Sequence, residues 1–138
     1  MSDEIDQREA ELLEAMSLDE YKKEYKAIAG TPLKNGETVT TKEAVIEAIR
    51  QIYDPEIPVN VYDMGLIYGI DIKQNGDIFI DMTLTAPGCP VAGILPQQVA
   101  DAVCALVGAG IVEVKLVWEP QWTIEKMTEE GRAMIDLF

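Results

Sequence analysis

Residues 66–84 hold the pattern that most restricts how this chain can fold. A period of two in the apolar residues indicates strands with one buried face, and Asn75–Gly76 interrupts it as a two-residue type I′ turn would. The sequence therefore predicts a β-hairpin. Its alternating apolar positions are Leu66, Tyr68, Ile70 and Ile72 before the turn, and Ile78, Ile80, Met82 and Leu84 after it.

A helical pattern precedes the hairpin. Thr40 and Glu43 have the spacing of a capping box, and apolar residues then recur at helical intervals. Pro55 should end this helix, because the residue before a proline is disfavoured in the helical region. We expect the helix to run from about residue 40 to about Tyr53.

A second helix is expected within residues 90–107. Proline is tolerated in the first turn of a helix but not in its interior, so the helix begins either at Pro90 or only at Pro96. Gly108 should end it, and a third strand is expected over residues 112–116.

This order of elements predicts an α+β fold over residues 39–138. We expect a compact two-layer domain, with a three-stranded or slightly larger mixed sheet and helices packed on one face. Because a helical crossover precedes the third strand, that strand can pair in parallel with one of the hairpin strands.

Residues 1–38 are expected to form a separate acidic extension. Residues 1 to about 28 have an incomplete apolar helical stripe, and residues 30–36 resemble a linker. Only Arg8 opposes the acidic side chains of the first twenty residues, which are Asp3, Glu4, Asp6, Glu9, Glu11, Glu14, Asp19 and Glu20.

Charge and hydropathy exclude several classes of partner. A formal net charge of -14 would repel phosphate backbones and anionic lipid heads, so we expect neither nucleic-acid nor membrane partners. No apolar run has the length of a membrane span, and the acidic N-terminus lacks a secretory pattern. A cytoplasmic location is expected.

The chain has no histidine, which excludes Cys-His and Ser-His-Asp nucleophile sites and histidine-ligated metal sites. The two cysteines, Cys89 and Cys104, are expected to be reduced thiols more than 7 Å apart between Cα atoms. Cys104 is predicted to be a partly buried, inert residue within a helix.

Cys89 is the strongest candidate for chemistry, because Gly88 and Pro90 confine it to a loop between a strand and a helix. If the helix begins at Pro90, Cys89 is its N-cap and the helix end favours the thiolate; if it begins at Pro96, that argument weakens. The alternative is a small buried hydrophobe in a turn.

Other polar residues are weaker candidates. Asp54 and Glu56 place two carboxylates on a rigid turn, where they bind a cation or partner, accept a proton, or only form a solvated helix stop. Asp63 is a weaker candidate for the same roles. The hydroxyls of Thr83 and Thr85 either face the Cys89 loop or belong to an ordinary strand.

Trp118 and Trp122 lie near the end of the chain, with Pro120 between them. Such large side chains either close the core or form a surface for a partner, and core closure is the expected role.

Four segments of the chain coincide with the motifs of one known family, and they are Asp54–Glu56, Asp63–Tyr68, Met82–Pro90 and Trp118–Trp122. Together they resemble the SufT type of metal-sulfur cluster assembly factor, in the family that also includes PaaD-like proteins and eukaryotic cytosolic iron-sulfur targeting factors. The resemblance covers residues from about 40 to 130. It implies a compact α+β domain, a role in iron-sulfur protein maturation, and functional importance for Asp54, Glu56, Thr85 and Cys89. The chain lacks the cysteine-rich C-terminal segment of the PaaD-like branch, which favours the SufT type.

The resemblance makes Cys89 the expected metal ligand for a transient iron-sulfur cluster or iron. One cysteine supplies one of the four ligands that a two-iron, two-sulfur core needs. A second copy, small thiols, or a scaffold or client protein must supply the others. We therefore expect a homodimer or a complex, acting as carrier or adaptor and not as an enzyme.

Two alternatives remain open. In a cysteine-dependent enzyme, Asp54 or Glu56 would be the base for Cys89, although a carboxylate with a pKa of about 4 is a poor base for a thiol with a pKa of about 8.5. In an interaction module, the tryptophan tail and acidic extension would dock clients, and Cys89 would be structural. The carrier hypothesis expects Cys89 to be accessible and to share one surface with Asp54 and Glu56.

Overall fold

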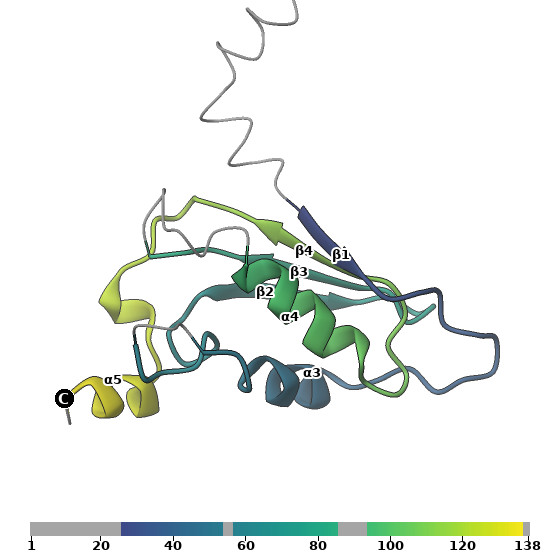
Figure 1. Cartoon of the computed structure of the whole chain (residues 1–138), viewed down its shortest axis with the longest axis horizontal. Coiled ribbons are helices and arrows are strands. Elements are labelled where there is room, and N and C mark those ends of the chain that lie inside the picture. Colours follow the sequence, from purple (N-terminus) through teal and green to yellow (C-terminus); the bar gives the residue numbers. More distant parts are fainter. Residues whose placement is uncertain (1–25, 54–56, 86–93, 137–138) are drawn as a thin grey trace, which may run out of the picture.

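The structure is a computed structural model, and it describes residues 26–53, 57–85 and 94–136 (Figure 1). The described chain contains four strands, three α-helices and one short 3₁₀ helix. Their order is β1 (Lys26–Ala29), α3 (Lys42–Ile49), β2 (Ile67–Ile72), β3 (Ile78–Met82), α4 (Leu95–Cys104), β4 (Val112–Leu116), the short 3₁₀ helix η1 (Ile124–Lys126) and α5 (Glu129–Asp136).

The four strands form one mixed sheet in the order β1-β4-β3-β2. β2 and β3 are an antiparallel hairpin, β3 and β4 are parallel, and β1 pairs antiparallel with β4. Helix α4 packs across β1 and β4, and α3 packs against α4, so both helices lie on the same face of the sheet (Figure 1). These findings confirm the two-layer α+β fold and the parallel pairing of the third predicted strand.

The core fills the space between the sheet and these helices. In β3, Ile78 and Ile80 are fully buried while Phe79 between them is exposed, as the two-residue period requires. In α4, Val99 and Val103 are one turn apart and both buried. The opposite face of the sheet is thus the more polar and exposed one.

Strand β1 corrects the expectation of a helix that continues to about residue 28. Residues 26–29 pair with β4, and the side chain of Ala27 is buried opposite Val114. An edge strand of four residues gains its stability from its neighbour, so the local pattern does not reveal it. The sheet therefore begins at Lys26, and a helical extension remains a prediction only for residues 1–25, which lie outside the described ranges.

Helix α3 begins one residue later than the capping-box pattern predicted. Its N-cap is Thr41, not Thr40, and the Thr41 hydroxyl accepts a hydrogen bond of 3.2 Å from the backbone N–H of Ala44. Thr40 instead donates its backbone N–H to the carbonyl of Gly108, at 3.0 Å. The contact with the distant Gly108 decides between two adjacent threonines that are equally good caps.

Helix α3 also ends earlier than expected, at Ile49 instead of about Tyr53. The next turns are tighter, because the N–H groups of Gln51 and Ile52 donate to carbonyls three residues before them. Tyr53 then forms an isolated antiparallel bridge with Asn60. This bridge brings the two described flanks of residues 54–56 together.

The hairpin turn is not of type I′. The N–H of Lys73 donates to the carbonyl of Asp77 at 2.8 Å, which leaves a three-residue loop. Gly76 has a φ of 94°, whereas Asn75 does not have a positive φ. A type I′ turn needs positive φ at both central residues, so this loop is the three-residue kind in which glycine alone adopts the left-handed conformation.

Helix α4 begins at Leu95, with Ile94 as its N-cap and Pro96 in the first turn. The alternative start at Pro90 is therefore wrong, and Cys89 is not the N-cap of this helix. The N-cap position of α4 therefore does not stabilise the Cys89 thiolate. Strand β3 likewise ends at Met82, two residues before the predicted end at Leu84.

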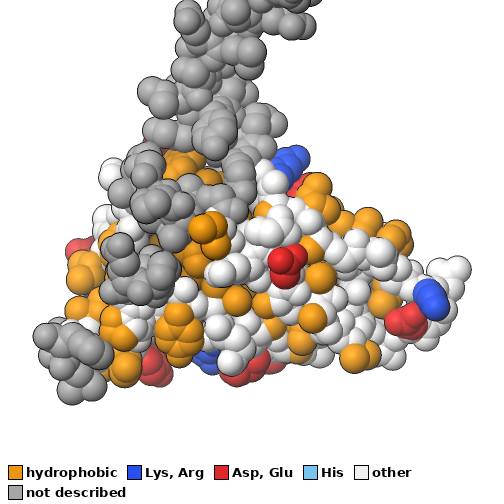
Figure 2. Space-filling view, viewed as in Figure 1, with side chains coloured by type: hydrophobic (Ala, Val, Ile, Leu, Met, Phe, Trp, Pro, Cys, Tyr) orange, Lys and Arg blue, Asp and Glu red, His pale blue; other side chains and the backbone are white. Residues whose placement is uncertain are grey.

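No helix within the three described ranges is long and apolar enough to cross a membrane. On the face drawn in Figure 2, charged side chains lie scattered among apolar and uncharged ones.

A polar connection fixes the C-terminal helix to the rest of the domain. Thr128 precedes α5, and its hydroxyl accepts a hydrogen bond from the N–H of Gly131 at 3.1 Å. The same hydroxyl donates to the carboxylate of Asp63 at 3.0 Å, and the Thr128 N–H donates to the Asp63 carbonyl, also at 3.0 Å. One threonine thus caps α5 and attaches it to a turn far away in the sequence.

We expect Thr128→Ala to lower the free energy of unfolding by about 1 to 2 kcal/mol, because it removes both the cap and the bond to Asp63. Thr123→Ala is the matched control, since Thr123 precedes η1 but makes no capping hydrogen bond. Urea denaturation of both variants measures the difference. Equal stability of the two variants would contradict this role of Thr128.

Candidate functional site

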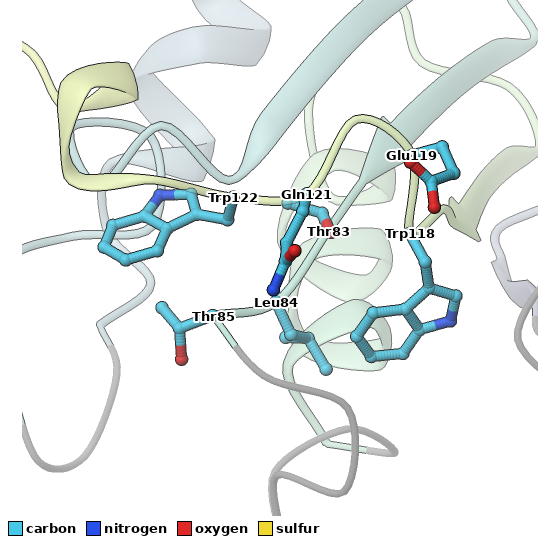
Figure 3. Close-up of a pocket in the computed structure, with 7 residues that line it drawn as sticks. All are labelled: Thr83, Leu84, Thr85, Trp118, Glu119, Gln121 and Trp122. Carbon is cyan, nitrogen blue, oxygen red and sulfur yellow. The ribbon is translucent and has the colours of Figure 1, made fainter.

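The candidate site lies where the parallel strands β3 and β4 end. Parallel strands place their carboxyl ends at one edge of a sheet, and ligands of α/β proteins commonly bind there. At this edge the chain that leaves β3 and the chain that leaves β4 form a pocket with a volume of about 190 Å³ (Figure 3). Its lining residues are Thr83, Leu84, Thr85, Trp118, Glu119, Gln121 and Trp122.

Backbone hydrogen bonds hold the two segments in place beyond the strand ends. The N–H of Val117 donates to the carbonyl of Met82, and the N–H of Thr83 donates to the carbonyl of Leu66, both at 2.8 Å. The segment that leads from β3 towards Cys89 is therefore held between its two neighbours in the sheet.

Side chains hold the segment from Trp118 to Trp122 on the domain. The Tyr68 hydroxyl donates to the carbonyl of Pro120 at 2.6 Å, and the Trp122 indole N–H donates to the carbonyl of Met64 at 2.7 Å. Burial raises the pKa of the Tyr68 phenol, the Thr83 hydroxyl opposes this shift, and the Glu119 carboxylate adds to it. The phenol thus stays protonated near neutral pH and remains a donor.

The two tryptophans combine the roles that were weighed for them. Trp118 and Trp122 are half-buried and pack against the hydrophobic core, which confirms core closure. Both also line the pocket, where they lie on either side of Gln121 in the view of Figure 3. Their rings therefore form walls of the pocket that are positioned by packing against the core.

The structure brings one predicted site residue to this pocket. Thr85 is half-buried in its lining and directly precedes residues 86–93. Thr83 also lines the pocket, but it is only 1% exposed. Cys89, Asp54 and Glu56 lie outside the described residues, so the surface shared by these three residues remains a prediction.

Sequence reasoning missed three residues of this site, namely Tyr68, Glu119 and Gln121. The resemblance drew attention to the segment from Trp118 to Trp122 as a whole. However, its spacing does not show which polar side chains face a pocket, and Tyr68 is fifty-two residues away from the Pro120 carbonyl to which it donates.

Asp63, weighed as a weaker candidate, has a structural role. Its carboxylate accepts hydrogen bonds from the Asn60 amide at 2.7 Å and from Thr128, and Arg50 lies 3.8 Å from it. Within the described ranges, no group of three or more cysteine, aspartate or glutamate side chains could hold a metal ion.

Cys104 is the free thiol of the described residues, at the end of α4. It is half-buried, and its sulfur donates to the carbonyl of Asp101 at 3.3 Å. Burial raises the pKa of this thiol, and the Asp101 carboxylate raises it further. Cys104 is thus held in the protonated, less reactive form, as its position in the helix predicted.

Comparison with known proteins identifies the family. Residues 42–116 match the family model described as "Iron-sulfur cluster assembly protein". An Fe-S protein maturation auxiliary factor of Porphyromonas gingivalis is 44% identical over 103 residues, which cover 75% of this chain and 96% of the relative. The Fe-S protein maturation auxiliary factor SufT of Staphylococcus aureus is 32% identical, over 61% of this chain and 96% of its own length.

A solved structure agrees with the fold. The crystal structure of a domain of unknown function, DUF59, from Bacillus anthracis superposes with a TM-score of 0.67 at 28% sequence identity, over 70% of this chain and 92% of that one. Sequence, fold and relatives all support the resemblance seen in the four motif segments. The chain belongs to the iron-sulfur cluster assembly protein family.

Proposed function

We propose that this protein is an accessory factor in the maturation of iron-sulfur proteins, and that it acts through the thiol of Cys89 as a carrier or adaptor. The observation that carries the proposal is the position of Thr85. This residue lines the pocket at the ends of β3 and β4, and residues 86–93, which include Cys89, follow it directly. A group held by Cys89 would therefore be attached beside a preformed pocket.

The ligand count favours a carrier over a protein that retains its own cluster. Cys89 supplies one thiolate, Cys104 is held protonated, and the chain has no histidine. A two-iron, two-sulfur cluster needs four ligands. The cluster or iron would then be transient cargo, held jointly with a second copy, small thiols, or a scaffold or client protein.

We propose supporting roles for the remaining candidates. The Thr85 hydroxyl would donate a hydrogen bond to the Cys89 thiolate, and Asp54 and Glu56 would lie on the same surface and orient the partner or cargo. An enzymatic role is disfavoured, because carboxylates with ordinary pKa values are poor bases for a thiol.

A client-binding adaptor with no cluster of its own is the second candidate, and the two half-buried tryptophans of the pocket favour it. Tryptophan is enriched among residues that dominate binding between proteins. For both the carrier and the adaptor, the proposed partner is a scaffold or client protein in the cytoplasm. The charge of -14 disfavours nucleic acid.

Anaerobic reconstitution with iron and sulfide tests the carrier. We expect wild-type protein to develop the absorption bands of an iron-sulfur cluster, and Cys89→Ser to lose them, because serine does not replace the thiolate as a ligand. Cys104→Ser is the matched control and should reconstitute as wild type does. Full reconstitution of Cys89→Ser would show that the Cys89 thiol is not a cluster ligand. Maturation of client proteins by Cys89→Ser at the wild-type rate would favour the adaptor.

The reactivity of Cys104 gives a pH test in the Cys89→Ser variant. Because the folded environment raises the pKa of Cys104, its alkylation by iodoacetamide should rise through a midpoint above the free-thiol value of about 8.5. The unfolded protein in urea should show the ordinary midpoint, and Asp101→Asn should lower the folded one in part. A folded midpoint at or below that of the unfolded protein would contradict the assignment.

Assembly follows from the ligand count. Native mass spectrometry should detect cluster on a dimer, on a mixed complex, or on a monomer that also carries small thiols. Removal of the small thiols should strip cluster from the monomer, since one cysteine cannot hold it. A monomer that keeps its cluster after this treatment would show that other side chains of the chain are ligands.

A further inference from the structure

The pocket at the ends of β3 and β4 is suited to one side chain and not to a cofactor. Its volume of about 190 Å³ is below the roughly 300 to 1,000 Å³ of sites for small molecules and cofactors. Glu119 and Gln121 in its lining are exposed, so a residue on the surface of another protein could reach it (Figure 3).

The walls of the pocket favour a cation with an apolar stem. Trp118 and Trp122 present indole rings, which attract cations to their faces and pack against methylene groups. Both rings are held by the core, and Trp122 is fixed further by its hydrogen bond to the Met64 carbonyl. A ligand would lose little free energy in ordering these walls.

The polar side chains of the pocket can accept hydrogen bonds from a cation. Glu119 is exposed at the pocket and takes no part in the ion pairs found within the described ranges. The negative charge of Glu119 helps to raise the pKa of the neighbouring Tyr68 phenol. Gln121 adds an amide oxygen between the two indoles (Figure 3).

We propose that this pocket binds an arginine side chain of a partner polypeptide. The methylene stem would pack against the indole rings that line the pocket, and the guanidinium would donate hydrogen bonds to the Glu119 carboxylate and the Gln121 amide oxygen. Arginine fits better than lysine because its planar group stacks on indoles and its paired donors match a carboxylate. The net charge of -14 would attract a basic partner surface.

This inference rests on the proposed function only for the identity of the partner, which would be an iron-sulfur scaffold or client. Its arginine would position that partner beside the Cys89 loop. The binding of arginine itself can be measured without iron, sulfide or the partner.

The chain contains two tryptophans and both line the pocket, so their indole N–H signals in NMR spectra report on this site. We would titrate the full chain with a blocked Gly-Ser-Arg-Ser-Gly peptide and with the same peptide carrying citrulline, the neutral analogue of arginine. The arginine peptide should shift both signals saturably and bind at least about fivefold more tightly than the citrulline peptide.

Glu119→Gln should weaken binding of the arginine peptide about fivefold, because it keeps the shape and removes the charge. Glu37→Gln is the matched control. Glu37 is exposed and its segment packs near Gly76 and Gly108, at the opposite end of the sheet. The Glu37→Gln variant loses the same charge but should bind the arginine peptide within about twofold of wild type, since exposed charges at that distance are screened.

Three results would each overturn the proposal. They are equal binding of the arginine and citrulline peptides, equal weakening by Glu119→Gln and Glu37→Gln, and tighter binding of free arginine than of the peptide, which would indicate a small-molecule site. Cys89→Ser should bind the arginine peptide as wild type does, because the thiol takes no part in the proposed contacts. Loss of cluster in that variant would thus test the proposed function separately.

Discussion

The parallel pairing of β3 with β4 is the interaction on which the other features depend. It joins Ile78–Met82 to Val112–Leu116 in the middle of the sheet, and the connection between these strands must cross the sheet through α4. The crossover covers one face and creates the core. The outer edges of the pair are then occupied by β2 and β1, which completes a sheet of four strands.

The same pairing creates the candidate site, because it makes two chain segments leave the sheet at one edge. One segment leads through Thr85 towards Cys89, and the other carries Trp118 and Trp122. Two hydrogen bonds, from the Tyr68 hydroxyl to the Pro120 carbonyl and from the Trp122 indole to the Met64 carbonyl, hold the second segment on β2 and on the turn before it. The chain that continues to residues 86–93 thus leaves the sheet beside the segment from Trp118 to Trp122, and this arrangement supports the proposed site.

Family membership and ligand count lead to a consistent account of the chemistry. Under the proposed function, Cys89 would supply one of the four ligands that a cluster needs and would hold cargo only briefly, since the chain has no histidine. The second cysteine, Cys104, differs because burial and a nearby carboxylate keep it protonated. An acidic domain with a small aromatic pocket next to the loop could select partners by charge and by one anchoring side chain.

The periodic patterns by themselves determined the hairpin, the β4 strand, the two central helices and hence the α+β class, because each depends on the spacing of apolar residues within one segment. The four motif segments likewise indicated the family. Only the tertiary structure decided that residues 26–29 are a strand and that Thr41 and not Thr40 caps α3. It also decided that Glu119 and Gln121 line the pocket and that Tyr68 holds the segment between them. Each of these depends on a neighbour far away in the sequence, such as β4 for residues 26–29 or Pro120 for Tyr68, and no local spacing encodes such a neighbour.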